Sequence, residues 1–163
     1  MKTITRFHAQ KMVETLAGMA LGYLPAEELE AMMDNFDVLK AEVEKLEKMK
    51  AELAKRIYQG VDEKRLQAFF DAIQKNDEAI AEEYSDLVPL RNKEIEVIVS
   101  LFNKAVELDI KELDGKEFRK AVLKSQPNTK QAVFEVLTPL FKAEEKPEDD
   151  FSELDTLLKE QPL

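Results

Sequence analysis

A seven-residue hydrophobic repeat between residues 25 and 59 constrains this chain more than any other feature of its sequence. One row of positions spaced by seven is apolar except at Lys50, and an interleaved row is apolar throughout. The first row is Leu29, Phe36, Val43, Lys50 and Ile57, and the second is Met32, Leu39, Leu46 and Leu53. Two such rows predict the apolar seam of one long, coiled-coil-like helix. Pro25 suits the first turn of this helix, and Gly60 suits its end.

A second seam follows over residues 62–87 and has the same alternating spacing of four and three. Its members are Leu66, Phe70, Ile73, Ile80, Tyr84 and Leu87, with Asp77 in one slot. Few residues separate the two seams, so they predict an antiparallel helical hairpin over residues 25–88. Lys50 and Asp77 are interpreted as polar residues that set the register of this seam.

Shorter helices are expected around the hairpin. The pattern predicts them over residues 5–22, 114–124 and 128–142, with Asp114 and Glu117 at capping-box spacing and a bend at Pro139. Residues 92–112 fit either a helical stripe or two alternating strands. We favour the helix because no glycine or strong turn pair separates the two runs, and the alternative is a small β-hairpin near residues 94–110. The fold class is therefore mainly α.

Composition excludes several chemistries. The chain has no cysteine, one histidine and four glycines, and its formal net charge is −10. Thiolate catalysis, cysteine-ligated metals and a three-histidine zinc site are thus excluded within one chain. A calcium loop centred on Gly115 fails because Ile110 and Ala121 would stand where acids are needed. No glycine-rich phosphate loop is present, so the sequence predicts a protein that is not an enzyme and has no catalytic residue, cofactor or metal ligand.

The negative charge disfavours direct binding to nucleic acid or to an anionic membrane surface. Residues 1–7 lack the continuous apolar run of a signal peptide, and no apolar run approaches the length of a membrane span. We therefore expect a cytoplasmic protein.

The last segment, residues 143–163, differs in composition from the expected helical domain over residues 1–142. It holds eight acidic residues and two lysines, and residues 144–150 are typical of an extended linker. A short apolar stripe follows, made of Phe151, Leu154, Leu157 and Leu158. Such a stripe either docks into a groove of a protein partner or packs against its own bundle. These four residues are the candidate partner-binding site.

Helix faces of the hairpin are a second candidate contact surface. Met32 with Met33, and Phe69 with Phe70, form adjacent apolar pairs that are too wide for one narrow seam. They predict a wider contact, either to the first helix or to a second copy of the chain.

The order of elements resembles a group of small phage- and prophage-encoded helical-hairpin proteins. The residues that carry this resemblance are Glu94-Ile95-Glu96-Val97 and the run from Ala105 to Ile110, within residues 1–112. Pro89 and the additional C-terminal helices depart from that pattern. The resemblance implies a mobile-element origin and an accessory, non-enzymatic role. It also adds weight to a strand within residues 94–110.

Three classes of function follow from these features. We expect a protein–protein interaction factor, an adaptor, assembly or regulatory protein that acts through helix faces and the acidic tail. The first alternative is an acidic inhibitor that mimics nucleic acid on a basic partner surface. The second is a helical protein that binds a small molecule in a closed pocket.

Overall fold

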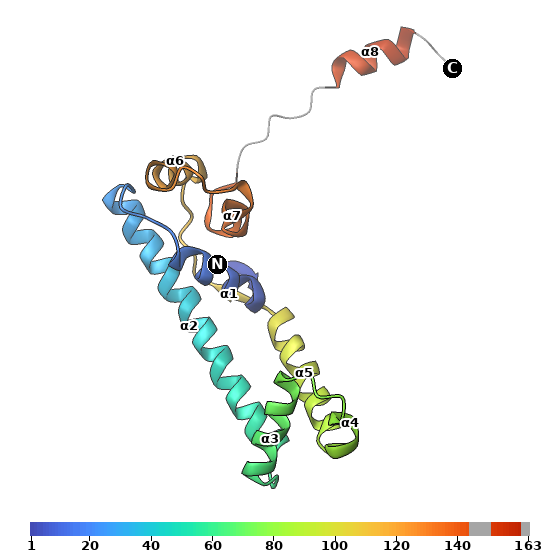
Figure 1. Ribbon diagram of the computed structural model, residues 1–163. Coiled ribbons are helices and arrows are strands. Elements are labelled where there is room, and N and C mark those ends of the chain that lie inside the picture. The colour runs from blue at the N-terminus through green and yellow to red at the C-terminus, as the bar shows by residue number, and fades with distance from the viewer. Residues whose placement is uncertain (144–150, 161–163) are drawn as a thin grey trace.

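The structure is a computed structural model that describes residues 1–143 and 151–160. It shows a mainly helical protein with one small antiparallel sheet (Figure 1), which confirms the expected fold class. The elements are β1 (Lys2–Thr5), α1 (Arg6–Ala17), α2 (Ala26–Ile57), α3 (Glu63–Gln74), α4 (Ile80–Glu83), α5 (Val88–Asn103), β2 (Ala105–Leu108), α6 (Gly115–Ser125), α7 (Gln131–Val136), the 3₁₀ helix η1 (Thr138–Leu140) and α8 (Ser152–Glu160).

The long helix predicted from the seven-residue repeat is α2. Met32, Leu39 and Leu46 are fully buried along it, and Leu53 is half-buried near its end. The helix begins directly after Pro25, and the chain turns at Gly60, whose φ of 85° lies in the region that glycine tolerates best. The seam therefore faces the interior, as the repeat predicts.

The chain returns beside α2 through α3, α4 and α5, which completes the helical hairpin (Figure 1). The expected single helix over residues 62–87 is wrong, because α3 ends at Gln74 and Asn76 adopts a positive φ of 49°. Asp77 lies exposed in this break and accepts a hydrogen bond from the Ala79 amide at 3.0 Å. It is a turn residue and has no place in a buried seam.

The main contact of the returning arm with α2 is made by α5. The Lys50 ammonium lies 5.6 Å from the ring centroid of Phe102, a cation–π contact across these two helices. Lys50 thus takes a half-buried position by covering an aromatic ring with its charge and an apolar surface with its stem.

The sheet pairs strands that are far apart in the sequence. β1 and β2 run antiparallel, with Ile4 opposite Val106 and Lys2 opposite Leu108. The helix favoured over residues 92–112 is confirmed as far as Asn103, where α5 ends. Of the alternative β-hairpin near 94–110, the second strand is present as β2, but residues 94–103 are helical and the partner of β2 is β1.

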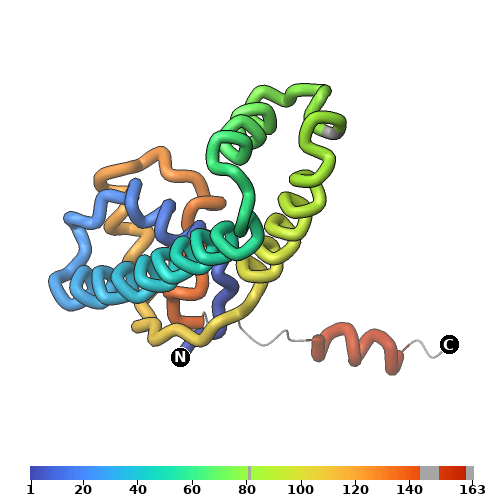
Figure 2. The backbone as a smooth tube through the Cα atoms, turned by 90° about the horizontal axis from the view of Figure 1, so that it is seen from below, coloured from blue at the N-terminus to red at the C-terminus, as the bar shows by residue number. Residues whose placement is uncertain are grey.

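The main core lies at the beginning of α2, where α1, α6, α7 and η1 surround it (Figure 2). Asp114 caps α6 as predicted, since its carboxylate accepts from the amides of Lys116 and Glu117 at 2.9 and 3.2 Å. The first helix is shorter than expected, and the expected helix over residues 128–142 is divided into α7 and η1, with Pro139 inside η1. The buried core residues are Ile4, Ala9, Met12, Leu16, Leu24, Met32, Leu39, Leu108, Ile110, Leu113, Phe118, Ala121, Val122, Phe134, Leu137 and Leu140.

An aromatic cluster closes the other end of the hairpin. Phe69 is buried between Phe70 and Tyr84, with ring centroids 5.8 and 5.3 Å away. Tyr58 meets Phe70 edge-on at 5.5 Å. The Phe69–Phe70 pair therefore serves the protein's own packing, whereas Met33 is 59% exposed on α2.

Candidate functional site

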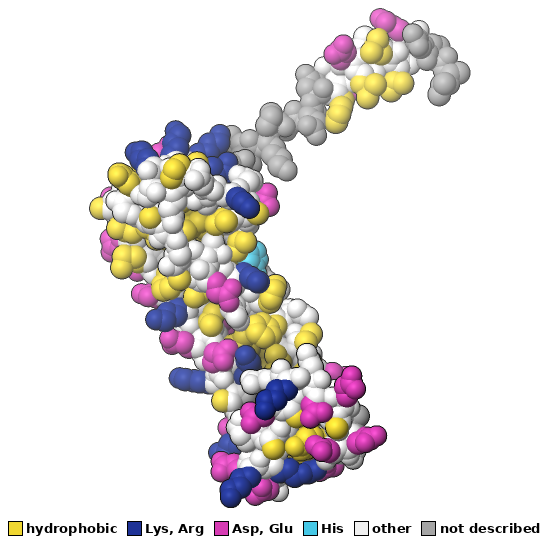
Figure 3. Space-filling view, viewed as in Figure 1, with side chains coloured by type: hydrophobic (Ala, Val, Ile, Leu, Met, Phe, Trp, Pro, Cys, Tyr) yellow, Lys and Arg dark blue, Asp and Glu magenta, His cyan; other side chains and the backbone are white. Residues whose placement is uncertain are grey.

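Three of the four apolar residues predicted as a binding site lie on one side of α8, and Phe151 directly precedes the helix and completes this apolar face. Phe151, Leu154, Leu157 and Leu158 are 60%, 52%, 52% and 62% exposed. At 3.6 residues per turn their spacing places them on a single face, and Figure 3 shows apolar side chains gathered along one side of this helix. None of residues 151–160 is buried, so the face is open to an incoming surface.

Local sequence explains why this segment is helical. Glu153 and Asp155 lie in the first turn and Lys159 in the last, which is the favourable arrangement with the helix dipole. The Asp155 amide donates to the carbonyl oxygen of Phe151 at 2.9 Å. At 100° per residue, Glu153 and Asp155 border the apolar face on its two sides. The predicted linker, residues 144–150, lies outside the described residues.

A groove of about 660 Å³ lies between the N-terminal strand and the C-terminal helices. Its apolar lining comes from Phe134, Pro139 and Phe141. Its charged lining is three basic residues and one acidic residue: Lys2 of β1, Arg119 of α6, Lys142 and Glu135 of α7. We call this feature the basic groove.

Contacts behind the basic groove hold its lining in place. Phe118 packs edge-on against Phe134 and lies 5.1 Å from the Phe141 ring, and Arg119 covers the Phe134 ring at 5.5 Å. His8 Nε2 donates to the Val136 carbonyl oxygen at 2.7 Å and ties α1 to α7. The only histidine is thus a structural link.

Sequence reasoning missed the basic groove because its residues come from separate elements and the total charge hides it. Residues 115–142 hold six basic and two acidic side chains, a net charge of +4 in a chain of −10. Figure 3 shows Lys and Arg side chains gathered at the α6–α7 end of the molecule. A charge count over short windows would have found this signal.

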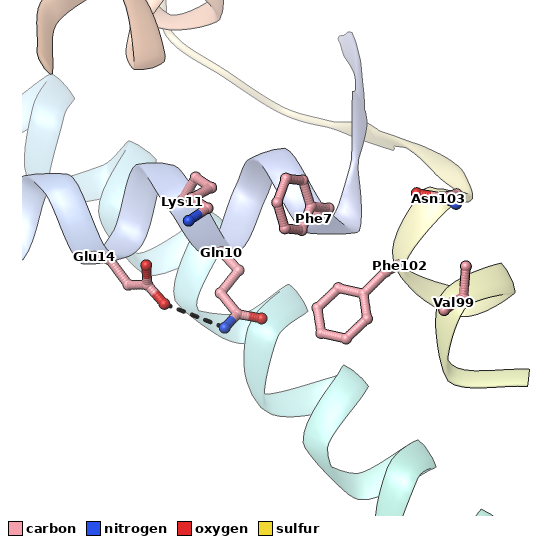
Figure 4. Close-up of a pocket in the computed structure, with 7 residues that line it drawn as sticks. All are labelled: Phe7, Gln10, Lys11, Glu14, Val99, Phe102 and Asn103. Atoms are coloured by element: carbon pink, nitrogen blue, oxygen red, sulfur yellow. Dashed lines mark hydrogen bonds between the residues drawn. The ribbon is translucent and has the colours of Figure 1, made fainter. Parts of the chain in front are cut away.

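A smaller pocket of about 340 Å³ opens between α1 and α5 (Figure 4). Phe7 and Phe102 meet edge-on at 6.2 Å, and Val99 lies beside them. In the polar lining, Gln10 Nε2 donates to Glu14 Oε1 at 3.2 Å, whereas Gln10 Oε1 is buried with no hydrogen-bond partner among the described residues. The pocket offers an apolar contact patch and no acid–base pair aimed at a reacting atom.

A buried electrostatic contact between Tyr58 and Glu94 is structural. Tyr58 Oη donates to Glu94 Oε1 at 3.0 Å, and Arg91 pairs with the same carboxylate. Burial, together with the bond to Glu94, raises the pKa of Tyr58 to about 12. The Tyr58–Glu94–Arg91 contact joins the end of α2 to α5 within the hairpin. Its role is therefore to stabilise the packing of these two helices.

Metal and membrane chemistry find no support in the part of the chain that the structure describes. No group of three or more metal-ligating side chains gathers among residues 1–143 and 151–160. Over the same residues, no helix combines the length and apolar character needed to cross a membrane.

Comparison with known proteins found no matching family model, no matching curated protein and no matching solved structure. The resemblance to phage-encoded hairpin proteins therefore stays a prediction.

Proposed function

We propose that this protein is a non-enzymatic protein–protein interaction factor and that α8 is its docking helix. The observation that carries the proposal is the open apolar face of α8, on which Phe151, Leu154, Leu157 and Leu158 are each more than half exposed. An amphipathic helix with such a face binds a hydrophobic groove through residues spaced by three and four. The mobile-element origin implied by the resemblance is compatible with an accessory role of this kind.

The burial pattern supports separate roles for the tail, which binds the partner, and the rest of the chain, which forms the folded core. Among residues 1–143 and 151–160, the buried core runs from Ile4 to Leu140, and α8 contributes no buried residue. Interaction and stability are thus carried by different residues. Removal of residues 143–163 should leave the helical domain folded, because the described residues of this segment, 143 and 151–160, are all exposed.

The test is affinity capture from a native lysate of the cells that make the protein. We compare the full chain, a chain that ends at residue 142, and the variant L154Q/L158Q. The truncation removes the apolar face, and L154Q/L158Q replaces two of its four apolar residues. We expect each change to lower partner recovery at least about tenfold.

The matched control is T156Q/K159Q, which introduces the same two side chains on the opposite face of α8. It should capture the partner as the full chain does, and circular dichroism should show the same helicity for the full chain and the two double variants. Equal capture by the chain that ends at residue 142 would reject α8 as the docking helix.

The salt dependence of the binding affinity distinguishes this function from nucleic-acid mimicry. An acidic mimic must weaken strongly between low and moderate ionic strength, because its carboxylates stand in for phosphates. A contact through the leucines of α8 should retain most of its affinity over the same range.

A further inference from the structure

We infer that the basic groove binds α8 of a second copy of this chain, so that two copies exchange their C-terminal helices. The inference rests on the proposed function, since it names the partner of the docking helix. It draws on three observations: the chemistry of the groove, the charge of the two segments, and the fact that both surfaces are open in a single chain.

The groove and the helix are complementary in their arrangement of apolar and charged side chains. Phe134, Pro139 and Phe141 give the groove an apolar lining, and beside it the basic residues Arg119 and Lys142 outnumber the one acid, Glu135. On α8 the order is the same with opposite charge: an apolar stripe bordered on both sides by an acidic residue. An acidic amphipathic helix in this groove places leucines against aromatic rings and carboxylates against cations.

The cations of the groove are available for such a contact. Within the described residues Lys120 pairs with Glu117, and Lys2 pairs with Glu112. Arg119 and Lys142 have no ion pair with any acid in that part of the chain, and both are exposed. Residues 115–142 carry a net charge of +4 and residues 143–163 carry −6. The most acidic and the most basic segments of the chain are therefore neighbours in sequence.

One chain leaves both surfaces uncovered. The apolar side chains of α8 are more than half exposed, and the groove stands open at about 660 Å³. Each copy offers one helix and one groove, so a reciprocal exchange covers two helices and two grooves with two identical contacts. Such an exchange closes on itself with two-fold symmetry and leaves no surface free for further growth.

A charge exchange between two variants tests this inference. The groove variant is R119E/K142E, and the tail variant is E153K/D155K. Each variant alone places like charges in both contacts of a dimer, so each should raise the dimer dissociation constant at least about tenfold relative to the unmodified chain.

An equimolar mixture of the two variants should restore the dimer. The acidic helix of the groove variant meets the basic groove of the tail variant, and the basic helix of the tail variant meets the acidic groove of the groove variant. The readout is molar mass by light scattering as a function of concentration, with a mass tag on one variant to show one copy of each per dimer.

The matched control is K48E/K64E, which reverses two exposed lysines on α2 and α3, away from the groove. It should dimerise as the unmodified chain does, and urea unfolding of every variant confirms that each is folded. The dimer should weaken only modestly as salt is raised, because salt screens the flanking ion pairs but not the apolar contact of the leucines.

Three results would overturn the inference. The first is an unmodified chain that stays monomeric at all concentrations, and the second is a dimer that persists in both variants alone. The third is a mixture that fails to associate, as expected if each helix occupies the groove of its own chain. Loss of partner capture on removal of α8 would still uphold the proposed function in each case, so the two proposals fail separately.

Discussion

Single polar side chains hold distant parts of this fold together. Asn35 is fully buried on α2, and its side chain makes both hydrogen bonds that a neighbouring strand would make to Lys111. Its Nδ2 donates to the Lys111 carbonyl oxygen, and its Oδ1 accepts from the Lys111 amide, each at 2.8 Å. One amide therefore ties the segment after β2 to the long helix.

Replacement of this amide should be costly. We expect N35A to lower the free energy of unfolding by about 1–3 kcal/mol, because the donor and the acceptor of Lys111 lose their partners. The measurement is urea denaturation followed by circular dichroism.

The control for N35A is D34N on the same turn of α2. Asp34 pairs with the Lys111 ammonium in solvent, and this pair raises the pKa of that lysine. Screening by water makes the pair weak, so D34N should change stability much less than N35A. Equal effects of the two substitutions would contradict the role assigned to Asn35.

The buried phenol of Tyr58 leads to a pH dependence. Burial and Glu94 raise its pKa from 10.0 to about 12, so the folded state holds this proton more tightly than the unfolded state. The stability that this provides is fully present below pH 10 and is lost as the pH rises through about 12.

Comparison with Y58F isolates this effect. The difference in unfolding free energy between the unmodified chain and Y58F should shrink as the pH rises between these two values. Parallel stability curves for the two proteins across that interval would show that Tyr58 titrates at its ordinary value. Phenolate absorbance of the folded protein provides an independent measure of the same titration.

At the scale of elements, the length and the buried face of α2 were predictable from sequence. A seven-residue repeat reports which side of a helix is apolar, and Met32, Leu39 and Leu46 occupy that side. The repeat does not report what covers that side. In the structure α1 and α5 pack along α2, whereas sequence reasoning assigned this role to the next seam along the chain.

Burial along α2 is graded, which gives a prediction for two identical substitutions. Leu39 is fully buried in the main core, so L39A should cost about 2–5 kcal/mol. Leu53 is half-buried nearer the end of the helix, so L53A should cost about 1 kcal/mol. Urea unfolding measures both, and equal costs would mean that the seam is buried evenly along its length.

Two features of the fold were not predicted, for different physical reasons. The pairing of β2 with β1 was not predicted because β1 is short and its partner lies about 100 residues further along the chain, a relation that no local sequence pattern records. The end of α3 depends on Asn76, one of the residue types that tolerate a positive φ. The seam continued through this position in the sequence, so periodicity alone indicated an unbroken helix.

At the scale of the molecule, the two candidate surfaces differ in how far the sequence indicated them. The apolar face of α8 was predictable because its four residues lie within eight consecutive positions, three in one short helix and Phe151 directly before it. The basic groove was not, because β1, α1, α6 and η1 each supply part of its lining. A site built by one element can be found from spacing, whereas a site built by several requires their packing.

The pairing of β1 with β2 also orders events during synthesis. Residues 2–5 leave the ribosome long before residues 105–108, and until then Ile4 has no strand to lie against. During this time the apolar residues of α1 and of the beginning of α2 stay uncovered, because α6 and α7, which complete the same core, have not yet been made. A nascent chain of this protein therefore carries an unfinished apolar surface through most of its translation, and that interval is when chaperones would meet it.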